Sequence, residues 1–563
     1  MVRTKMKTLI AALLFMGLGY YGAAQEETME TIYEGIEFDM PRVKETSFPD
    51  YSKNIREFGA ESGGMVKNTE AIKKTIEDVN AKGGGKVVIP RGLWLTGPII
   101  LKSNINLHLE AGALLIFSRD FDDYHLIETS FEGLNTVRNI SPIYAKGVEN
   151  IAITGKGTID GSGDAWRFVK KEKMTDSQWK KLVNSGGVLS EDGKQWYPSE
   201  NAKLGHELSS DQNVPDLEGI EAHQKVKDYL RPVMVSIVES KRILLDGPTF
   251  QNSPAWNIHP LMSEDIIVRN INVRNPWYSQ NGDGLDIESC KNVLIYNNTF
   301  DVGDDAICFK SGKNEDGRNR GMPTENVIVK NNIVYHGHGG VVMGSEMSGD
   351  IRNIHISKAT FMGTNVGLRF KSTRGRGGVV ENIYISNIDM INIPNEPITF
   401  NLFYGGQAPS LAQGQDAIKK VNDAKIFPVT EETPSFRNIF MKDIRATGSG
   451  RAAFFMGLPE KNVQNIHIEN SVFEADQGIT AIDVDGLVLT NVKVLSPNDT
   501  ALTIYNGKNV TIRDFTYAEE GNTPVRVLGK KSEKIKFQKK DFKSSKEQVF
   551  RDKEVAKNAV NIN

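Results

Sequence analysis

The chain has 563 residues, and its 68 basic and 71 acidic residues leave a formal net charge of −3. This balance excludes the basic excess that is typical of nucleic-acid binding. A hydrophobic content of 39% with 52 glycines indicates a folded chain with many turns rather than a disordered one. The length allows one large domain or two modest ones.

Residues 1–24 have the three parts of a secretory signal peptide. A basic start is followed by an apolar run and by the small pair Ala23-Ala24, directly before an acidic segment. The alternative is an uncleaved anchor, but the apolar run is short for a membrane-spanning helix. We therefore predict a secreted or periplasmic protein without stable membrane insertion.

Residues 25–52 are interpreted as an irregular lead-in. The next segment predicts a helix over 68–85, with Asn68 as its cap and glycines at its end. Residues 86–117 alternate β-branched and apolar residues with short glycine and asparagine breaks, which predicts consecutive short strands.

A recurring unit then dominates the chain: Asn, Asp or Gly followed by alternating aliphatic residues. Starts at 242, 265 and 292 are 23 and 27 residues apart, and those at 326, 353 and 382 are 27 and 29 apart. The occurrences are NIAI (150–153), RILL (242–245), DIIV (265–268), NVLI (292–295), NVIV (326–329), NIHI (353–356), NIYI (382–385), NIFM (438–441), NIHI (465–468), GLVL (486–489) and NVTI (509–512).

Such a period indicates a solenoid, in which stacked coils bury the apolar side that one coil cannot bury alone. Asparagine and glycine suit corners that need a left-handed backbone. We predict an all-β fold, a right-handed parallel β-helix, over residues 53–530. A β-sandwich array is the alternative, but it lacks so sustained a register.

Two segments interrupt the period, at 164–231 and 401–434, and the first contains a predicted amphipathic helix over 166–183. Insertions in solenoids often gather on the binding face, although either one is equally consistent with a packing flap. Residues 531–563 are rich in charge and are interpreted as a solvated cap or a partly disordered tail.

Four polar clusters occur at intervals near one coil length: NGDGLD (281–286), GDDA (303–306), GHGG (337–340) and RFK (369–371). Residues one coil apart stack on the same face of a solenoid, and Arg369 and Lys371 share a face because they are two apart in a strand. We therefore expect these side chains to converge: Asp283, Asp304, Asp305, His338, Arg369 and Lys371.

This combination suits cleavage of an acidic sugar. Glycosidic cleavage needs a proton donor and a carboxylate, and crowded carboxylates keep one proton among them. Arg369 and Lys371 are suited to a sugar carboxylate. Each cluster alone is more often a turn, a loop histidine or a solvated strand face, so the prediction depends on their coincidence.

The order NGDGLD, GDDA, GHG, RFK resembles the signature of the polygalacturonase family of glycoside hydrolases (family 28), written NTD, G/QDD, G/SHG and RIK. Stretches such as GGGKVVIP, LTGPIILKSNINLHLEAGA and GTIDGSG extend the resemblance over about residues 53–515. The departures are Gly282 in place of threonine, which is expected to loosen the loop that holds Asp283, and Phe370 in place of isoleucine.

The resemblance implies that Asp304 is the general acid and that Asp283 and Asp305 position and deprotonate the attacking water. His338 would tune the acid or recycle protons. It further implies inversion at the anomeric carbon, with no cofactor and no metal.

The resemblance also implies that Arg369 and Lys371 bind the uronate at the cleavage point. Four further residues lie close to these clusters in the coil register and are weaker candidates for substrate contact: Asp286, Lys310, Asn257 and His259. The expected partner is a pectic poly- or oligosaccharide bound by a monomer, cut from the chain end if either insertion covers the groove.

Several alternatives stay open at this point. A β-helix pectate lyase, which eliminates with calcium, offers similar residue types, and a non-catalytic carbohydrate-binding solenoid is a second rival. The residues do not choose among homogalacturonan, rhamnogalacturonan and substituted galacturonans. Cys290 and Cys308 either pair or remain buried thiols.

Overall fold

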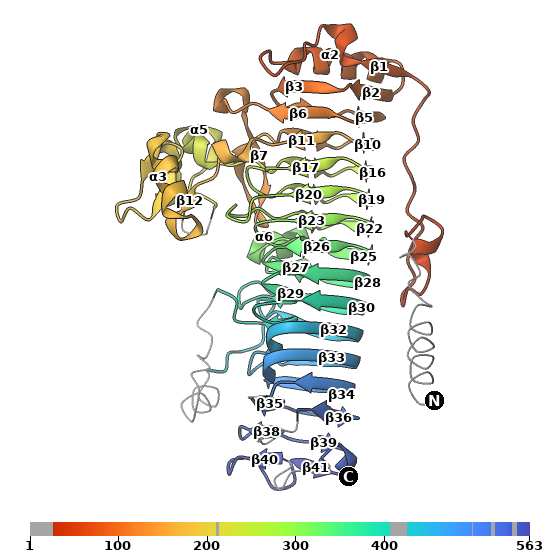
Figure 1. The fold of residues 1–563 in the computed structure, drawn as a ribbon, viewed down its shortest axis with the longest axis vertical. Helices are drawn as coiled ribbons and strands as arrows, with labels where there is room; N and C mark the ends of the chain where they lie inside the picture. The colour runs from red at the N-terminus through yellow and green to blue at the C-terminus, as the bar shows by residue number, and fades with distance from the viewer. Residues whose placement is uncertain (1–25, 210–212, 406–424, 498, 519–523, 543–548) are drawn as a thin grey trace, which may run out of the picture.

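The computed structural model describes residues 26–209, 213–405, 425–497, 499–518, 524–542 and 549–563. The predicted signal peptide and the middle of the 401–434 insertion lie outside these ranges. Short parallel strands stack coil upon coil along one axis (Figure 1). The predicted parallel β-helix is confirmed.

The strands form three columns, each of which pairs parallel to the next coil. The first column contains β1 (Ser52–Asn54), β2 (Gly85–Ile89), β5 (Ile105–Leu109), β10 (Glu149–Gly155), β16 (Lys241–Asp246), β19 (Glu264–Arg269), β22 (Lys291–Tyr296), β25 (Thr324–Lys330), β28 (Ile351–Met362), β30 (Val379–Ile391), β32 (Ser435–Met456), β33 (Val463–Ile482), β34 (Val484–Leu495), β36 (Thr511–Arg513), β39 (Ile535–Phe537) and β41 (Val560–Ile562). The second contains β3 (Gly92–Thr96), β6 (Ala113–Phe117), β11 (Thr158–Asp160), β17 (Thr249–Gln251), β20 (Asn272–Arg274), β23 (Thr299–Asp301), β26 (Ile333–His336) and β37 (Thr516–Tyr517). The third contains β4 (Ile99–Ile100), β9 (Ile143–Lys146), β15 (Val235–Val238), β18 (Ile258–Leu261), β21 (Leu285–Glu288), β24 (Ile307–Lys310), β27 (Gly339–Met343), β29 (Val366–Lys371), β31 (Ile398–Asn401), β35 (Leu502–Tyr505), β38 (Val525–Leu528) and β40 (Val549–Arg551). The long strands run through more than one column, since β28 also pairs with β26, β32 with β31, β33 with β35 and β34 with β37.

Asparagine most often occupies the corner at the start of the first-column strands. The opening residue of every recurring unit has a left-handed φ, as at Asn292 (59°), Asn326 (57°) and Asn353 (56°). The side chains also form a ladder, because Asn326 donates to Asn292 at 3.4 Å and Asn353 donates to Asn326 at 3.2 Å. Asparagine adopts this conformation at low cost and ties adjacent coils together.

The interior of the coils is one continuous apolar core. Alternate residues of a strand point inward: in β22, Val293 and Ile295 belong to this core, whereas Leu294 between them belongs to a separate cluster with Ile32. The helix α2 (Thr69–Ala81) packs at the first coils with Ile72, Ile76 and Val79 buried. This helix was predicted, but the Asn68 side chain does not cap it. It donates instead to the carbonyls of Glu61, Val66 and Leu95.

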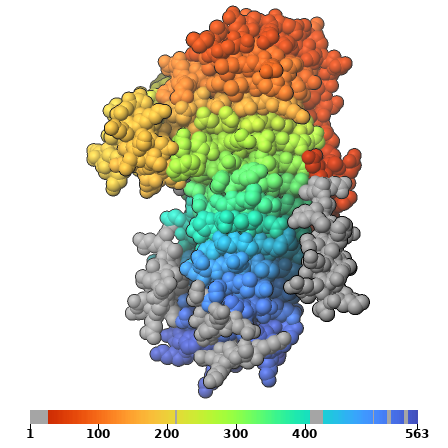
Figure 2. All heavy atoms as spheres, in the orientation of Figure 1, coloured from red at the N-terminus to blue at the C-terminus, as the bar shows by residue number. Residues whose placement is uncertain are grey.

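The insertion at 164–231 forms a lobe on one side of the solenoid (Figure 2). It contains β12 (Val169–Lys170), β13 (Val188–Leu189) and β14 (Gln195–Tyr197) in an antiparallel sheet, with α3 (Asp176–Asn184), α4 (Glu200–Glu207) and α5 (Gly219–His223). The predicted helix over 166–183 is therefore too long, since Thr175 caps α3 and β12 precedes it. A hairpin of β7 (Leu126–Phe131) and β8 (Leu134–Asn139) lies nearby, and α6 (Asn314–Arg320) follows β24.

Of the lead-in at 25–52, the described residues 26–52 run along the outer face of the solenoid, opposite the lobe (Figure 1). Ile32 is buried there in a cluster with Ile267, Leu294 and Ile328. At the other end, β39 pairs with β41 and β38 pairs with β40, so the strands continue past residue 530 into the charged C-terminal segment.

Candidate active site

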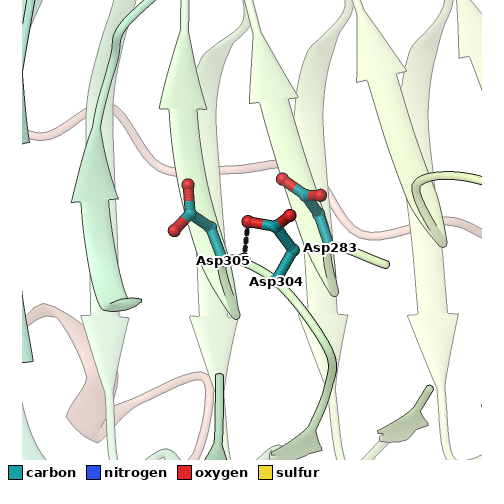
Figure 3. Close-up of side chains that lie close together, drawn as sticks. All are labelled: Asp283, Asp304 and Asp305. Atoms are coloured by element: carbon teal, nitrogen blue, oxygen red, sulfur yellow. Dashed lines mark hydrogen bonds between the residues drawn. The ribbon is translucent and has the colours of Figure 1, made fainter. Parts of the chain in front are cut away.

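Three aspartates meet in the turns that precede β21 and β24. The Gly284 amide donates to the Asp305 carbonyl at 2.9 Å, so Asp283 and Asp305 occupy equivalent positions one coil apart. Asp304 lies between them (Figure 3), and one oxygen from each carboxylate lies within 4.8 Å of the others. The repeat therefore places three carboxylates from two successive coils at one point.

The turn that carries Asp283 is tightly packed around Ser279. A Cβ atom at Gly282 would lie 2.0 Å from the Ser279 hydroxyl oxygen, and one at Gly303 would lie 2.4 Å from it. The Asn275 side chain also donates to the Gly282 carbonyl at 3.1 Å. The expectation that Gly282 loosens this loop is therefore wrong, because Ser279 fills the space that a side chain would take.

Asp305 is the ionised carboxylate of the cluster. Lys371 Nζ lies 2.6 Å from its Oδ2, and Arg369 Nη1 lies 3.4 Å from its Oδ1. Burial alone would raise the pKa of Asp305, but Lys371, Arg369 and Lys310 together hold it well below its ordinary value. Lys371 thus neutralises a neighbouring carboxylate as well as being a candidate for uronate binding.

Asp283 and Asp286 have the opposite electrostatics. Both are buried, and burial together with the neighbouring carboxylates raises the pKa of each well above its ordinary value. Both oxygens of Asp286 and one of Asp283 have no hydrogen-bond partner among the described residues. A proton is therefore retained on this side of the cluster, while Asp305 stays charged.

Asp304 is the most exposed of the three aspartates, with a side chain 24% exposed. Its Oδ1 accepts from the Asp305 amide at 3.1 Å and lies 3.2 Å from Nδ1 of His338. This contact with Asp304 raises the pKa of His338. These two contacts engage Oδ1, so Oδ2 is the oxygen better placed to reach a ligand.

The three aspartates also have the spacing of a cation site. However, the two cationic side chains at Asp305 already supply the positive charge that a metal would supply, with Lys371 Nζ at 2.6 Å. The residues present therefore suit an ion-paired cluster better than a metal centre, and the absence of a metal stays a prediction.

Arg369 and Lys371 lie on one face of strand β29, and Phe370 between them lies on the other face. Phe370 points into the core, where its ring stacks on Phe400 with centroids 4.2 Å apart. Arg369 and Lys371 lie on the opposite face, with Tyr404 5.5 Å and 5.0 Å from them, measured to its ring centroid. The departure at Phe370 is therefore a core substitution that leaves the cationic face unchanged.

The weaker candidates lie deeper. Lys310 Nζ contacts Glu346 at 3.0 Å and Asp286 at 3.6 Å, so it neutralises buried carboxylates beneath the cluster. His259 is 1% exposed and its Nε2 lies 2.9 Å from Glu288, which Arg320 also contacts at 2.6 Å.

Asn257 is likewise fully buried, and its backbone N–H donates to the Asp283 carbonyl at 3.0 Å. The positions of Lys310, His259 and Asn257 favour support of the site over direct contact with substrate. These roles stay predictions.

The insertions supply further site residues that the sequence patterns did not single out. Arg231 donates to the Gln280 carbonyl at 2.8 Å and to the Asn281 side chain at 2.9 Å, on the turn before Asp283. Lys173 is close enough for its charge to oppose the raised pKa of His338. Their location in an insertion was the only available signal, because an insertion has no repeat register.

The family model described as glycosyl hydrolases family 28 matches residues 215–449, which include the whole cluster. The crystal structure of a hyperthermoactive exopolygalacturonase from Thermotoga maritima is 32% identical, with a TM-score of 0.62 over 84% of this chain and 94% of that one. The chain belongs to this family.

Two curated relatives agree with this placement. A probable polygalacturonase of Vitis vinifera is 27% identical over 430 residues, which cover 75% of this chain and 74% of that protein. An exo-poly-alpha-D-galacturonosidase of Dickeya chrysanthemi is 28% identical over 361 residues, which cover 62% of this chain and 57% of that protein. As a member of family 28, the protein is a glycoside hydrolase.

Proposed function

We propose that this family 28 glycoside hydrolase removes galacturonic-acid units from the ends of pectic poly- or oligosaccharides by adding water with inversion. The observation that carries the proposal is the cluster of Asp283, Asp304 and Asp305 in contact with Arg369 and Lys371. Carboxylates perform the proton transfers, and cations at the same point favour an acidic sugar. Similarity to exo-acting relatives supports it.

In the proposed reaction, Asp304 donates its proton to the glycosidic oxygen as the bond to the anomeric carbon breaks. A water between Asp283 and Asp305 loses a proton to Asp305 while its oxygen bonds to that carbon. Two oxygens 4.8 Å apart or closer can both accept hydrogen bonds of ordinary length from one water. Asp305 then releases to solvent the proton that it took from the water. His338 returns a proton to Asp304, which it contacts at 3.2 Å, and is itself reprotonated from solvent.

The anomer of the first product shows directly whether the enzyme inverts. Inverting carboxyl pairs are usually about 6.5–9.5 Å apart, whereas oxygens of this cluster lie within 4.8 Å. The proposal of inversion therefore rests on the family resemblance rather than on the separation. Proton NMR of the first product formed from a defined oligogalacturonide should show the β-anomer before mutarotation, and the α-anomer would contradict inversion.

The end-cutting mode is supported by the two insertions. Arg231 and Lys173 of the first insertion reach the turn of Asp283 and the neighbourhood of His338. Tyr404 of the second lies against Arg369 and Lys371. A site flanked in this way favours a chain end over the middle of a polymer.

Product analysis tests this mode. A long polygalacturonate should release mono- or disaccharide from the earliest times, with a slow fall in viscosity. Early oligomers of intermediate length would contradict the proposal. A panel of defined oligosaccharides from homogalacturonan, rhamnogalacturonan and substituted galacturonan identifies the linkage.

A calcium-dependent lyase makes different products. Elimination leaves a conjugated double bond that absorbs in the ultraviolet, whereas hydrolysis does not. Because Lys371 and Arg369 already neutralise Asp305, activity should be unchanged by a chelator. Loss of activity in the chelator with ultraviolet-absorbing products would favour the lyase, and no release of reducing ends from any pectic polymer would favour a binding solenoid.

We further propose that the protein acts as a monomer after export to the cell exterior or periplasm. The basic and apolar start of residues 1–24 supports export. No helix among the described residues is long and apolar enough to cross a membrane. Amino-terminal sequencing of the mature protein and its mass in solution test these two points.

A further inference from the structure

A hollow of about 700 Å³ lies between the insertion lobe and the side of the solenoid. Helix α3 contributes Lys181 to its wall, and β14 contributes Trp196. The solenoid contributes Arg119 and, from the turn after β20, Tyr278. The hollow is therefore formed jointly by the repeating coils of the solenoid and by the insertion lobe, which has no repeat.

Arg167 at the edge of this hollow is a buried cation whose hydrogen-bond donors are only partly satisfied. The residue is 1% exposed, and one of its nitrogens, Nη2, donates to the side chain of Asn252. Its Nε and Nη1 atoms have no hydrogen-bond partner among the described residues. Burying unpaired donors of a cation is costly unless a ligand supplies acceptors.

The other charges that line the hollow largely cancel. Arg119 and Asp164 form a bidentate pair with distances of 3.0 Å and 2.8 Å. Arg167 therefore leaves the hollow with a net positive charge, to which exposed Lys181 adds. An acceptor with a full negative charge and planar geometry, such as a carboxylate, matches a guanidinium best.

Aromatic rings supply the remaining lining. Phe121, Trp196 and Tyr278 border the hollow, and the Tyr278 ring centroid lies 5.9 Å from the Arg167 guanidinium. Apolar rings beside a small number of charged groups are typical of a site for a ligand with one apolar face and one charged group. A uronic-acid ring has both features.

The hollow lies on the opposite side of the aspartates from Arg369. Asn252, the partner of Arg167, follows β17, one coil before the turn that carries Tyr278 and Asp283. Arg369 belongs to β29, which follows both coils of the aspartate cluster. Arg369 and Arg167 therefore flank the aspartates on opposite sides along the solenoid axis, so a sugar chain that ran along the axis across the cluster would reach both.

We propose that this hollow is a subsite for a terminal uronate of the substrate, with the sugar carboxylate bound by Arg167. This assignment rests on the proposed function, because it names the group that the enzyme recognises beyond the cleaved bond.

Calorimetric binding of digalacturonic acid and of its methyl ester to an Asp304→Asn background tests the subsite. Adding Arg167→Gln should weaken binding of the acid at least about tenfold and leave the ester nearly unchanged, and Arg167→Lys should recover part of the loss. Equal affinity of the background and Arg167→Gln for the acid would overturn the proposal.

A second variant guards against misfolding at buried Arg167. Lys181→Trp fills the hollow from an exposed helix position and should weaken binding as much, whereas Lys180→Trp on the same helix removes the same charge away from the hollow and should not. If both tryptophan variants bind like the background, the proposal fails. Release of reducing ends by the wild-type enzyme is measured separately. Failure of the proposed function would appear in that activity assay, whereas failure of the subsite would appear only in the binding measurements.

Discussion

Nζ of Lys371 lies 2.6 Å from Oδ2 of Asp305, and the two side chains are 8% and 1% exposed. A buried contact of this kind fixes the charge of the carboxylate, since removing the cation would leave an unpaired buried anion. Lys371 therefore determines whether Asp305 can take a proton from water, in addition to any role in binding.

Replacing Lys371 by alanine should affect turnover as well as binding. The depressed pKa of Asp305 would rise, so the acidic limb of the pH profile of kcat/KM should move to higher pH, because a base is lost as pH falls through its pKa. Arg369→Ala should mainly raise KM for de-esterified substrate, because Arg369 is farther from Asp305 at 3.4 Å. An unshifted acidic limb in Lys371→Ala, or equal losses on acid and methyl-ester substrates in Arg369→Ala, would contradict these roles.

Replacing Asp304 by asparagine should remove nearly all turnover while the fold is retained. Loss of a general acid costs about 10²–10⁴ in rate. Asp301→Asn is a matched control, because Asp301 lies three residues earlier and pairs with exposed His336. The acid assignment is wrong if Asp304→Asn keeps more than about a tenth of wild-type kcat.

His338 should control the alkaline side of the pH profile. Contact with Asp304 raises the pKa of His338, so its proton is held to higher pH and lost only as pH rises through that raised value. His338→Gln should lower kcat by about tenfold or more and remove this limb. His336→Gln, which changes an exposed histidine two residues away, should leave the profile unchanged. An identical effect of both variants would exclude a specific role for His338.

Arg231 should act by positioning the turn of Asp283. Besides the side chain of Asn213 at 3.2 Å, its guanidinium reaches three acceptors around this turn, the carbonyls of Gln280 and Pro254 and the side chain of Asn281, at 2.8–3.1 Å. Lysine keeps the charge but cannot span all three, and misplacement of a reacting group by about 1 Å costs on the order of 10²-fold in rate. Arg231→Lys should therefore lower kcat more than it changes KM.

The control for this experiment is Arg274→Lys, at an exposed position on β20. It should keep the wild-type kcat. A wild-type kcat in Arg231→Lys, with the variant shown to be folded, would mean that the insertion does not position the aspartates.

The fold could be predicted because its determinants are local and repeated. Asn292, Asn326 and Asn353 mark corners that require a left-handed φ, and the aliphatic residues after each one face the core. The same register predicted that Asp283 and Asp305 stand one coil apart. Stacking converts spacing in the sequence directly into proximity in space.

What the sequence alone determined, then, is the stacked β-helix, the line of polar clusters along it and the family resemblance. Only the tertiary structure decided which charges meet: Lys371 with Asp305, Lys310 with Glu346, and His259 with Glu288 rather than with the aspartate cluster. It also decided that Arg231 contacts the turn of Asp283. Side-chain partners depend on rotamers and burial, and an insertion docks through contacts without a period, so neither is determined by spacing along the chain.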